Sequence, residues 1–347
     1  MFSPNFTITN KILINIAKIE AAEEVIKHSP LLPLWEKQFK EEAIVRQVHH
    51  GTHVEGNMLH FTEAKDVLQG KEIIGRPRDI QEIINYRKVV ELIDEEANKK
   101  IEKITELLIK KIHRIIVNKI LPDEEAGEYR LKQVIIRNSQ TGEVTFRPPP
   151  PIEVPFLMRE FFYWLNKDDK EQLHPILKAG IAHHEMVRIH PFIDGNGRIA
   201  RAVATLLLFL GGYDIRRFFS LEEFYDKDAV SYYENLQKAS AGDLTSWLEY
   251  FTLGAGIEFE KIKEKILKVS KDVKLKERFG GQQIYLTERQ IKIIEYLQEI
   301  GFLQNQSFAA IFPDISEDSV LRDLQDLLKK GLIKKIGSTK GARYVLT

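Results

Sequence analysis

The sequence has no cysteine, no excess charge of either sign and no apolar run long enough to cross a bilayer. The absence of cysteine among 347 residues excludes disulfides, thiolate catalysis and cysteine-ligated zinc. Lys and Arg total 51, as do Asp and Glu, so no global charge favours nucleic acid or membranes as partners. The most apolar stretch, Ala202–Leu210, is far shorter than a membrane span. Since the N-terminus also has no signal-peptide pattern, we expect a cytoplasmic protein without a membrane partner.

Apolar residues repeat at helical spacing over most of the chain. Hydrophobic residues make up 43% and charged residues 29%, the balance of a soluble globular protein. Helical spacing is clear over Lys11–Ile26 and Arg87–Ile120. From Pro155 to about Lys268, a dense apolar content indicates a helical core. The sequence therefore predicts a mainly α fold.

One short β-prone region interrupts the helices. The runs Gln133–Arg137 and Glu143–Arg147 flank Asn-Ser-Gln-Thr-Gly, a pattern that predicts a hairpin. Pro148–Pro151 follows as a rigid segment. We expect this segment to brace the base of the hairpin rather than to serve as a ligand for a partner module.

The last part of the chain has a different organisation. Amphipathic patterns predict helices over Thr287–Ile300, Ser307–Phe312 and Ser316–Lys330. Two β-prone runs, Leu-Ile-Lys-Lys-Ile and Arg-Tyr-Val-Leu, then flank a Gly-Ser-Thr-Lys-Gly turn. Three helices followed by a hairpin predict a winged helix-turn-helix domain over 286–347, after a charged linker at 269–285.

The most informative stretch is His190–Arg201, which reads His-Pro-Phe-Ile-Asp-Gly-Asn-Gly-Arg-Ile-Ala-Arg. A helix over Ile176–Ile189 is expected to end just before it, and a new helix is expected to begin within it. Gly195, Asn196 and Gly197 therefore lie at a helix N-terminus, where free N–H groups and the helix dipole favour an anion. Glycine also lets the backbone approach phosphate oxygens closely.

Charged side chains around this anion site support the same interpretation. Arg198 and Arg201 lie at i and i+3, hence on one helix face, and guanidinium groups bind phosphate oxygens in pairs. Asp194 offers a hard oxygen ligand suited to Mg²⁺ shared with phosphates. His190 has the proton affinity of a general base near neutral pH. Together these residue types are suited to holding a nucleotide and activating a hydroxyl beside its phosphates.

This stretch resembles the core motif of Fic-domain proteins, His-x-Phe-x-Asp/Glu-Gly-Asn-Gly-Arg-x-x-Arg, and meets every fixed position. The resemblance extends to residues near 45–120, to the hairpin with Pro148–Pro151, and to Asp243–Leu248. It implies a Fic-type helical core with a small hairpin as a flap. The implied domains are an N-terminal helical region at 1–120 with an inhibitory helix around 45–57, a catalytic core at 121–268 with the flap at 133–147, the linker at 269–285 and the winged helix at 286–347.

The resemblance also implies an activity. A protein adenylyltransferase moves AMP from ATP to a Ser, Thr or Tyr hydroxyl of a target protein, or of itself, and releases pyrophosphate. His190 would deprotonate the hydroxyl, and Asp194 would hold Mg²⁺ between the α- and β-phosphates. The Gly195–Gly197 segment would cradle the phosphates, while Arg198 and Arg201 would grip the β and γ groups.

Two further regions take a role from the resemblance. The flap would clamp a segment of the target protein by strand addition. Tyr232 and Tyr233 match the region near the adenine and ribose, and the alternative is that these aromatics belong to the core. ATP and Mg²⁺ are thus the expected ligands, and a protein is the expected substrate.

A second motif, Thr-His-Val-Glu-Gly-Asn at 52–57, resembles the inhibitory helix of the family, Ser/Thr-x-x-x-Glu-Gly/Asn. Glu55 and the two residues after it match, whereas the position four before it is Gly51. In the family this Glu bonds the last arginine of the core motif, here Arg201. Because a carboxylate competes with phosphate for the same guanidinium, we expect Glu55 to inhibit the use of ATP.

Two other functions stay open. The same site could remove AMP from a protein, if Glu55 orients a water molecule. Alternatively, the chain is a DNA-binding regulator with a weakly active Fic domain. The basic residues available for DNA are Arg322, Lys329, Lys330, Lys334, Lys335, Lys340 and Arg343. The acidic residues on the same last helix are Glu317, Asp318, Asp323 and Asp326. Because acidic groups oppose contact with phosphate, a protein partner or a homodimer is the alternative use of this domain.

Overall fold

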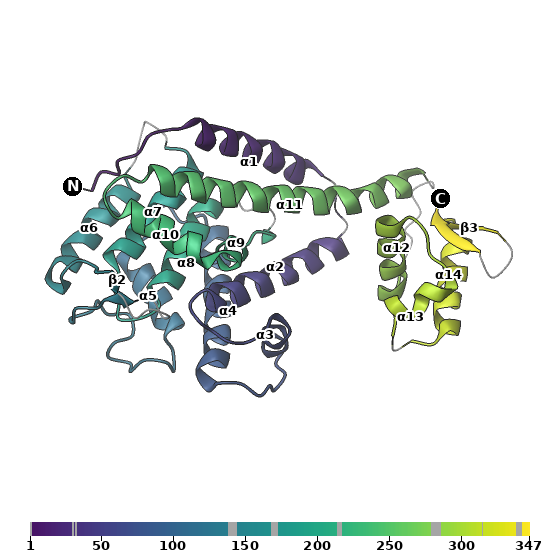
Figure 1. The fold of residues 1–347 in the computed structure, drawn as a ribbon, viewed down its shortest axis with the longest axis horizontal. Helices are drawn as coiled ribbons and strands as arrows, with labels where there is room; N and C mark the ends of the chain where they lie inside the picture. The colour runs from purple at the N-terminus through teal and green to yellow at the C-terminus, as the bar shows by residue number, and fades with distance from the viewer. Residues whose placement is uncertain are drawn as a thin grey trace. The chain divides into compact units, whose positions relative to one another are not determined.

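Helices dominate the computed structural model of this protein (Figure 1). It describes residues 2–29, 31, 33–137, 144–167, 173–213, 217–278, 286–313, 315–337 and 342–347. The prediction of a mainly α fold is confirmed. The chain divides into two compact units, one with Met1–Ser29 and Pro33–Glu264, the other with Pro30–Leu32 and Lys265–Thr347. None of the described helices combines the length and apolarity needed to cross a bilayer.

The larger unit contains most of the elements. They are α1 (Asn10–His28), α2 (Pro33–His53), α3 (Phe61–Leu68), α4 (Pro77–Asn98), α5 (Glu106–Ile116), β1 (Ile136–Arg137), β2 (Val144–Phe146), η1 (Pro151–Glu153), α6 (Val154–Leu165), α7 (Pro175–Ile189), α8 (Asn196–Leu210), α9 (Glu222–Lys227) and α10 (Ala229–Ala239). The long helix α11 (Thr245–Arg278) begins in this unit and ends in the other.

The helix pair α7 and α8 lies at the centre of the larger unit. α8 packs against α7, α4, α5 and α2. Its apolar residues Ile199, Val203 and Leu206 have no exposed surface. A helix that is apolar on most sides is stable only when neighbours cover it, which fixes α8 in the core. The N-terminus of α8 is thereby held beside the end of α2.

Residues 87–120 form two helices instead of the continuous one that their spacing suggests. α4 begins earlier, at Pro77, and ends at Asn98. The backbone of Lys100 then takes a left-handed conformation with φ 52°, and Thr105 caps α5 by accepting a hydrogen bond from Leu108 N–H. The helical spacing of apolar residues continues through this break, so the spacing alone does not show where α4 ends.

The hairpin is shorter than predicted. In the described part of this region, β1 and β2 pair antiparallel with an irregular register. The predicted turn at 138–142 and the first residue of the second predicted run, Glu143, lie outside the described residues. Gln133 donates from Nε2 to the carbonyl of Pro148 over 3.0 Å, and Arg130 donates from Nη2 to that of Pro149 over 2.5 Å. The proline segment thus lies against the base of the hairpin.

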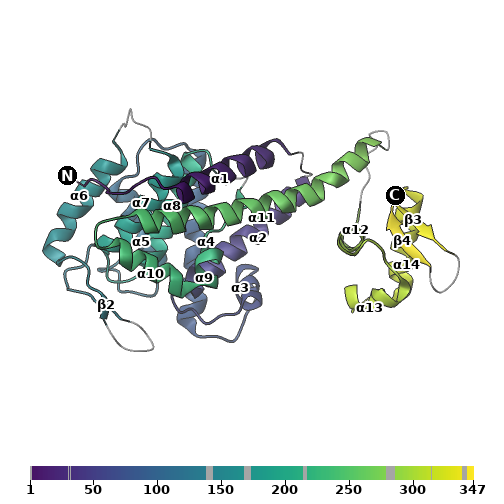
Figure 2. The ribbon, with the colours of Figure 1, turned by 45° about the horizontal axis from the view of Figure 1, so that its top comes forward.

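The N-terminal segment runs beside α11. In both views α1 lies along the first half of α11 (Figure 1, Figure 2). Asn15 donates from Nδ2 to Thr252 Oγ1 over 3.1 Å, and Leu244 N–H donates to the carbonyl of Asn5 over 2.9 Å. These bonds join the two ends of the larger unit.

The smaller unit forms the elements in the predicted order. They are α12 (Glu288–Ile300), η3 (Asn305–Ser307), α13 (Phe308–Ile311), α14 (Glu317–Lys329), β3 (Ile333–Ile336) and β4 (Arg343–Leu346). Thr287 caps α12 in a capping box with Gln290. The strands pair antiparallel, and Leu303 adds a backbone bridge to Tyr344. Residues 269–278 of the predicted linker are helical and form the last turns of α11, and 279–285 lie outside the described residues.

Candidate active site

The loop between α7 and α8 carries the motif. α7 ends at Ile189, and the capping residue His190 has a left-handed backbone with φ 50° and ψ 59°. Glycine usually occupies such a position, because a Cβ atom is strained there. A non-glycine residue in this conformation is the kind of local strain found at functional sites.

The start of α8 depends on Gly195 and on the amide side chain of Asn196. Gly195 has φ 75°, and a Cβ atom on it would lie 2.8 Å from Ile116 Cγ2, so only glycine fits. Asn196 accepts from Phe192 N–H and donates to the carbonyl of Phe192, each over 2.9 Å. Phe192 is buried and stacks on His113 at 3.9 Å between ring centres. The loop is therefore closed on itself and anchored in the core.

The contacts and burial of His190 favour a neutral imidazole ring. Its Nδ1 lies 3.3 Å from the carbonyl of Val187. Since a carbonyl only accepts, we assign the proton to Nδ1, which leaves a lone pair on Nε2. Burial lowers the pKa of His190 to about 4, and the charge of Arg130 acts in the same direction. The ring is thus neutral at neutral pH.

Arg130 positions the loop between α7 and α8, a role that the sequence did not predict. Its side chain is buried, and Nε donates to the carbonyl of His190 over 2.8 Å. Its backbone N–H donates to the carbonyl of Pro191 over 2.9 Å. Through the bond to Pro149 described above, Arg130 connects the loop between α7 and α8 to the base of the hairpin. A single arginine outside any motif offers no signal that reasoning from sequence could use.

The carboxylate of Glu55 forms ion pairs with both arginines of the motif. Its Oε1 accepts from Arg201 Nη2 over 2.6 Å, and its Oε2 accepts from Arg198 Nε over 2.9 Å. The side chains of Arg198 and Arg201 are 3% and 1% exposed, so each needs a charged partner. Burial disfavours the charge of Arg201, but Glu55 outweighs it and raises the pKa of Arg201 well above its ordinary value.

The Glu55 carboxylate also lies over the first turn of α8. A Cβ atom built on Gly197 would be 2.2 Å from Glu55 Oε1. The free N–H groups of a helix are in its first turn, and that is where a phosphate would bind. The carboxylate therefore lies where the sequence places an anion.

The segment that follows α2 is fastened on two sides. Asn57 is buried and donates from Nδ2 to the carbonyl of Asp79 and to Glu82, each over 3.0 Å. Tyr233 donates from its hydroxyl to the carbonyl of Val54 over 3.0 Å. These contacts hold the backbone on both sides of Glu55.

The structure explains why Gly51 stands where the family pattern has Ser or Thr. A Cβ atom on Gly51 would lie 2.4 Å from Cε1 of Tyr86, whose buried ring fills that space. The carbonyl of Gly51 accepts from Arg201 Nη2 over 2.8 Å. The neighbouring Thr52 donates back to the carbonyls of Val48 and His49 in its own helix.

Asp194 is paired with an arginine from outside the motif. Arg78, in the first turn of α4, donates from Nη2 to Asp194 Oδ2 over 2.6 Å. Arg198 lies 3.3 Å from Oδ1. Burial disfavours the charge of Asp194, but the positive charges of Arg198 and Arg78 have the larger combined effect and lower the pKa of Asp194. An ionised, partly exposed carboxylate at this position fits Mg²⁺, provided that the guanidinium of Arg78 moves away.

The two tyrosines have different surroundings. Tyr232 is 1% exposed, and its hydroxyl lies 2.8 Å from His183 Nε2. Tyr232 therefore belongs to the core, and its ring has no free face on which the adenine of a nucleotide could pack. Tyr233 is 47% exposed. Of the pair, it is the one that the structure leaves accessible near Glu55.

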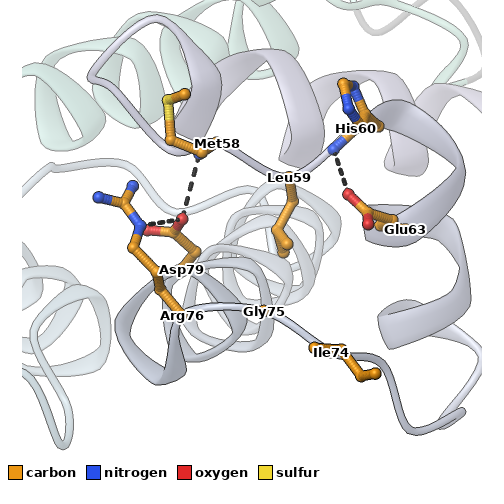
Figure 3. A pocket seen from close by; sticks show the side chains of 8 residues that line it. All are labelled: Met58, Leu59, His60, Glu63, Ile74, Gly75, Arg76 and Asp79. Atoms are coloured by element: carbon orange, nitrogen blue, oxygen red, sulfur yellow. Dashed lines mark hydrogen bonds and ion pairs between the residues drawn. The ribbon is translucent and has the colours of Figure 1, made fainter.

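The pocket in Figure 3 is separate from the motif. It has a volume of about 370 Å³ and lies where Met58, Leu59 and His60 approach the segment 74–79. Its dashed contacts join Met58 and Arg76 to Asp79, and His60 to Glu63. These are structural contacts beside the segment that carries Glu55, so we locate the candidate site at the motif.

The family comparison agrees with the motif. Residues 103–208 match the model of the Fic/DOC family. A protein adenylyltransferase Fic from Drosophila grimshawi is 32% identical over 217 residues, which cover 62% of this chain and 42% of that protein. One from Culex quinquefasciatus is 30% identical over 219 residues, which cover 62% and 40%. The chain thus spans less than half the length of these curated relatives.

Solved structures have the same fold. A Fic family protein from Desulfovibrio desulfuricans G20 superposes with a TM-score of 0.67 at 24% identity, covering 100% of this chain and 98% of that one. A Fic domain containing signaling protein from Bacteroides thetaiotaomicron VPI-5482 gives 0.61 at 25% identity, covering 76% and 97%. The prediction of a Fic-type helical core is confirmed.

Proposed function

We propose that this chain, whose residues 103–208 match the model of the Fic/DOC family, transfers AMP from ATP to a Ser, Thr or Tyr hydroxyl of a protein, and that Glu55 inhibits this transfer. One observation carries the proposal: a single carboxylate occupies both buried arginines of a complete motif. The names of the curated relatives support the same activity.

In the proposed reaction, Nε2 of His190 accepts the proton of the target hydroxyl. The hydroxyl oxygen then forms a bond to the α-phosphorus of ATP, and the bond from that phosphorus to the bridging oxygen of the β-phosphate breaks. Pyrophosphate leaves with the electron pair. Such displacements depend on positioning and on neutralising charge, which suits a rigid loop beside buried cations.

The phosphates would bind the first turn of α8 and the side chains of Arg198 and Arg201. Among the described residues, Arg201 Nε has no hydrogen-bond partner, so this guanidinium retains a donor for phosphate. Asp194 is the residue that would hold Mg²⁺, whose charge would offset that of the α- and β-phosphates. Tyr233 would lie beside the nucleoside.

Inhibition would follow from competition. The γ-phosphate and the carboxylate of Glu55 need the same guanidinium groups, and two anions do not share them. The side chain of Glu55 is 21% exposed, so it can leave towards solvent once the end of α2 moves. A partner or target that shifts this segment would release the enzyme.

The target segment would pair with the flap. Val144 on β2 and Ile135 beside β1 are exposed apolar side chains, 46% and 38% accessible. A two-stranded ribbon has free edges that can accept a further strand. An extended target segment laid there would bring its hydroxyl towards the loop that Arg130 connects to the hairpin.

The test is labelling of a lysate with a labelled ATP analogue by the Glu55→Gly variant. We expect labelled protein bands that are absent with Glu55→Gly/His190→Ala. Mass analysis should find a gain of one AMP per modified site. Removal of AMP from those products by the wild-type chain would instead support hydrolysis of the protein–AMP bond, with Glu55 orienting the attacking water.

We further propose that residues 286–347 form a winged helix that binds DNA. The supporting observation concerns the acidic residues of α14. Asp323 is buried against Arg289 at 2.7 Å, and Asp326 accepts from Gln290 over 2.7 Å. Two of the four acids are therefore paired with α12, while Arg322 and Lys329 are exposed.

A DNA titration tests this second proposal. The double variant Arg322→Ala/Lys329→Ala should weaken binding of duplex DNA and reduce its salt dependence, because each phosphate contact releases counterions. The matched control is Lys292→Ala on α12. Equal binding by both variants, or self-association of the chain without DNA, would argue for a protein partner or a homodimer.

A further inference from the structure

A cluster of histidines and one carboxylate lies beside the candidate site and has no part in the proposed chemistry. Its members are His49 and His50 in the last turns of α2 and Asp226 in α9, and one ligand atom of each lies within 4.8 Å of the others. We infer that these three residues bind a divalent transition metal, for which zinc is the best-suited ion.

His49 is set up as a ligand. Its Nε2 lies 3.1 Å from the carbonyl of Leu59, which only accepts, so the proton is assigned to Nε2 and Nδ1 keeps its lone pair. The residue is 7% exposed, and Nδ1 has no hydrogen-bond partner within the described part of the chain. Metal-bound histidines characteristically donate their other N–H to a carbonyl in this way. A metal would give this buried nitrogen the partner that it does not have among the described residues.

The other ligands converge from two helices. Asp226 Oδ2 lies 2.7 Å from His50 Nδ1, and Oδ1 lies 2.7 Å from His53 Nδ1. The ring of His53 stacks over that of His49 at 5.3 Å, four residues along the same helix face. His53 is 48% exposed and so marks the side open to solvent. This ring or a water molecule would supply the fourth ligand.

The donor set decides which metal fits. Two imidazole nitrogens and a carboxylate oxygen suit zinc and its neighbours, whereas Mg²⁺ and Ca²⁺ prefer oxygen ligands throughout. Zinc binds such atoms at about 2.0–2.2 Å, which places them about 3.5 Å apart in a tetrahedral site. On binding, separations near the 4.8 Å limit would shorten by about 1.3 Å, and the 2.7 Å contact of His50 with Asp226 would widen by about 0.8 Å. Side-chain rotation can supply both movements.

Cobalt(II) titration of the untagged, EDTA-treated chain tests the site without any need for ATP. We expect one Co²⁺ per chain, with the visible absorption of a tetrahedral complex, and its displacement by Zn²⁺. His49→Gln retains a donor for Leu59 but has no imidazole, and Asp226→Asn removes the charge. Each should weaken binding by at least about tenfold.

Two matched variants exclude other sites. His28→Ala removes an exposed histidine of α1, and Asp194→Asn removes the proposed Mg²⁺ ligand; both should bind Co²⁺ like the wild type. Circular dichroism confirms that each variant is folded. The inference is overturned if the wild type binds no Co²⁺, if His49→Gln binds it unchanged, or if Asp194→Asn abolishes binding.

One consequence rests on the proposed function. A metal held by both α2 and α9 would fix the end of α2 a few residues before Glu55. Zn²⁺ should then slow self-labelling of the wild type several-fold and leave the Glu55→Gly variant unchanged. Equal slowing of both variants would contradict this link. A lack of labelling in both, with Co²⁺ bound, would count against AMP transfer and leave the metal site intact.

Discussion

Arg78 donates from Nη2 to Asp194 Oδ2 over 2.6 Å, so a guanidinium from α4 covers the carboxylate assigned to Mg²⁺. At the same time, the carboxylate of Glu55 covers the guanidiniums assigned to phosphate. The charged groups proposed to bind Mg²⁺ and ATP are thus paired with one another within the protein. If the proposed function is right, both ion pairs would have to open before the nucleotide could bind productively.

Removing Arg78 should make the Mg²⁺ site easier to fill. In the Glu55→Gly background, Arg78→Ala should lower the Mg²⁺ concentration for half-maximal self-labelling. A partly exposed ion pair is worth up to about 1 kcal/mol, which corresponds to a shift of up to about fivefold. Lys88→Ala, an exposed change on the same helix, is the control. A higher Mg²⁺ requirement in Arg78→Ala would show that Arg78 assists binding instead.

Neutralising Glu55 should destabilise the chain and make it responsive to ATP. Glu55→Gln leaves the buried charges of Arg198 and Arg201 without their main partner, at a cost on the order of 3 kcal/mol. Mg²⁺-ATP should then raise the melting temperature of this variant more than that of the wild type. Glu234→Gln, an exposed change on α10, should match the wild type in both measurements. Equal ATP shifts in all three would contradict competition at the arginines.

A side chain at Gly51 should loosen the inhibited state. Gly51→Ala forces the ring of Tyr86 or the end of α2 to move, because the new Cβ would lie 2.4 Å from Tyr86 Cε1. We expect a loss of about 1–3 kcal/mol in unfolding free energy and increased self-labelling. Gly256→Ala is the matched control, since its nearest neighbour would be 3.9 Å away. There the change should be neutral or stabilising by up to about 1 kcal/mol.

Acid should destabilise the larger unit between about pH 6.5 and pH 4. Burial lowers the pKa of His113, His184 and His190 to about 4 and that of His183 further. In this range the unfolded chain binds more protons than the folded one, so stability falls as the pH falls. Each ring contributes up to about 1.4 kcal/mol per pH unit. Denaturant unfolding at pH 7 and pH 5 measures the loss, and His113→Asn should reduce it.

The sequence predicts the motif helices well and the surrounding residues poorly. α7 begins within one residue of its predicted start, because a proline opens it and the motif closes it. Capping residues likewise locate α12 and α14. The roles of Arg78 and Arg130 could not be predicted, because each contacts the loop between α7 and α8 from a part of the chain that is distant in sequence. The burial of Tyr232 also depends on tertiary packing, which a tyrosine pair in sequence does not reveal.

The central claim is that Glu55 holds a competent AMP-transfer site inactive, and the rate of self-labelling with Mg²⁺-ATP tests it most directly. Wild type, Glu55→Gly and Glu55→Gly/His190→Ala are compared by intact mass. We predict a large gain of AMP only in Glu55→Gly, with little in the wild type and none in the double variant. Equal labelling of wild type and Glu55→Gly, both lost on removal of His190, would contradict the claim.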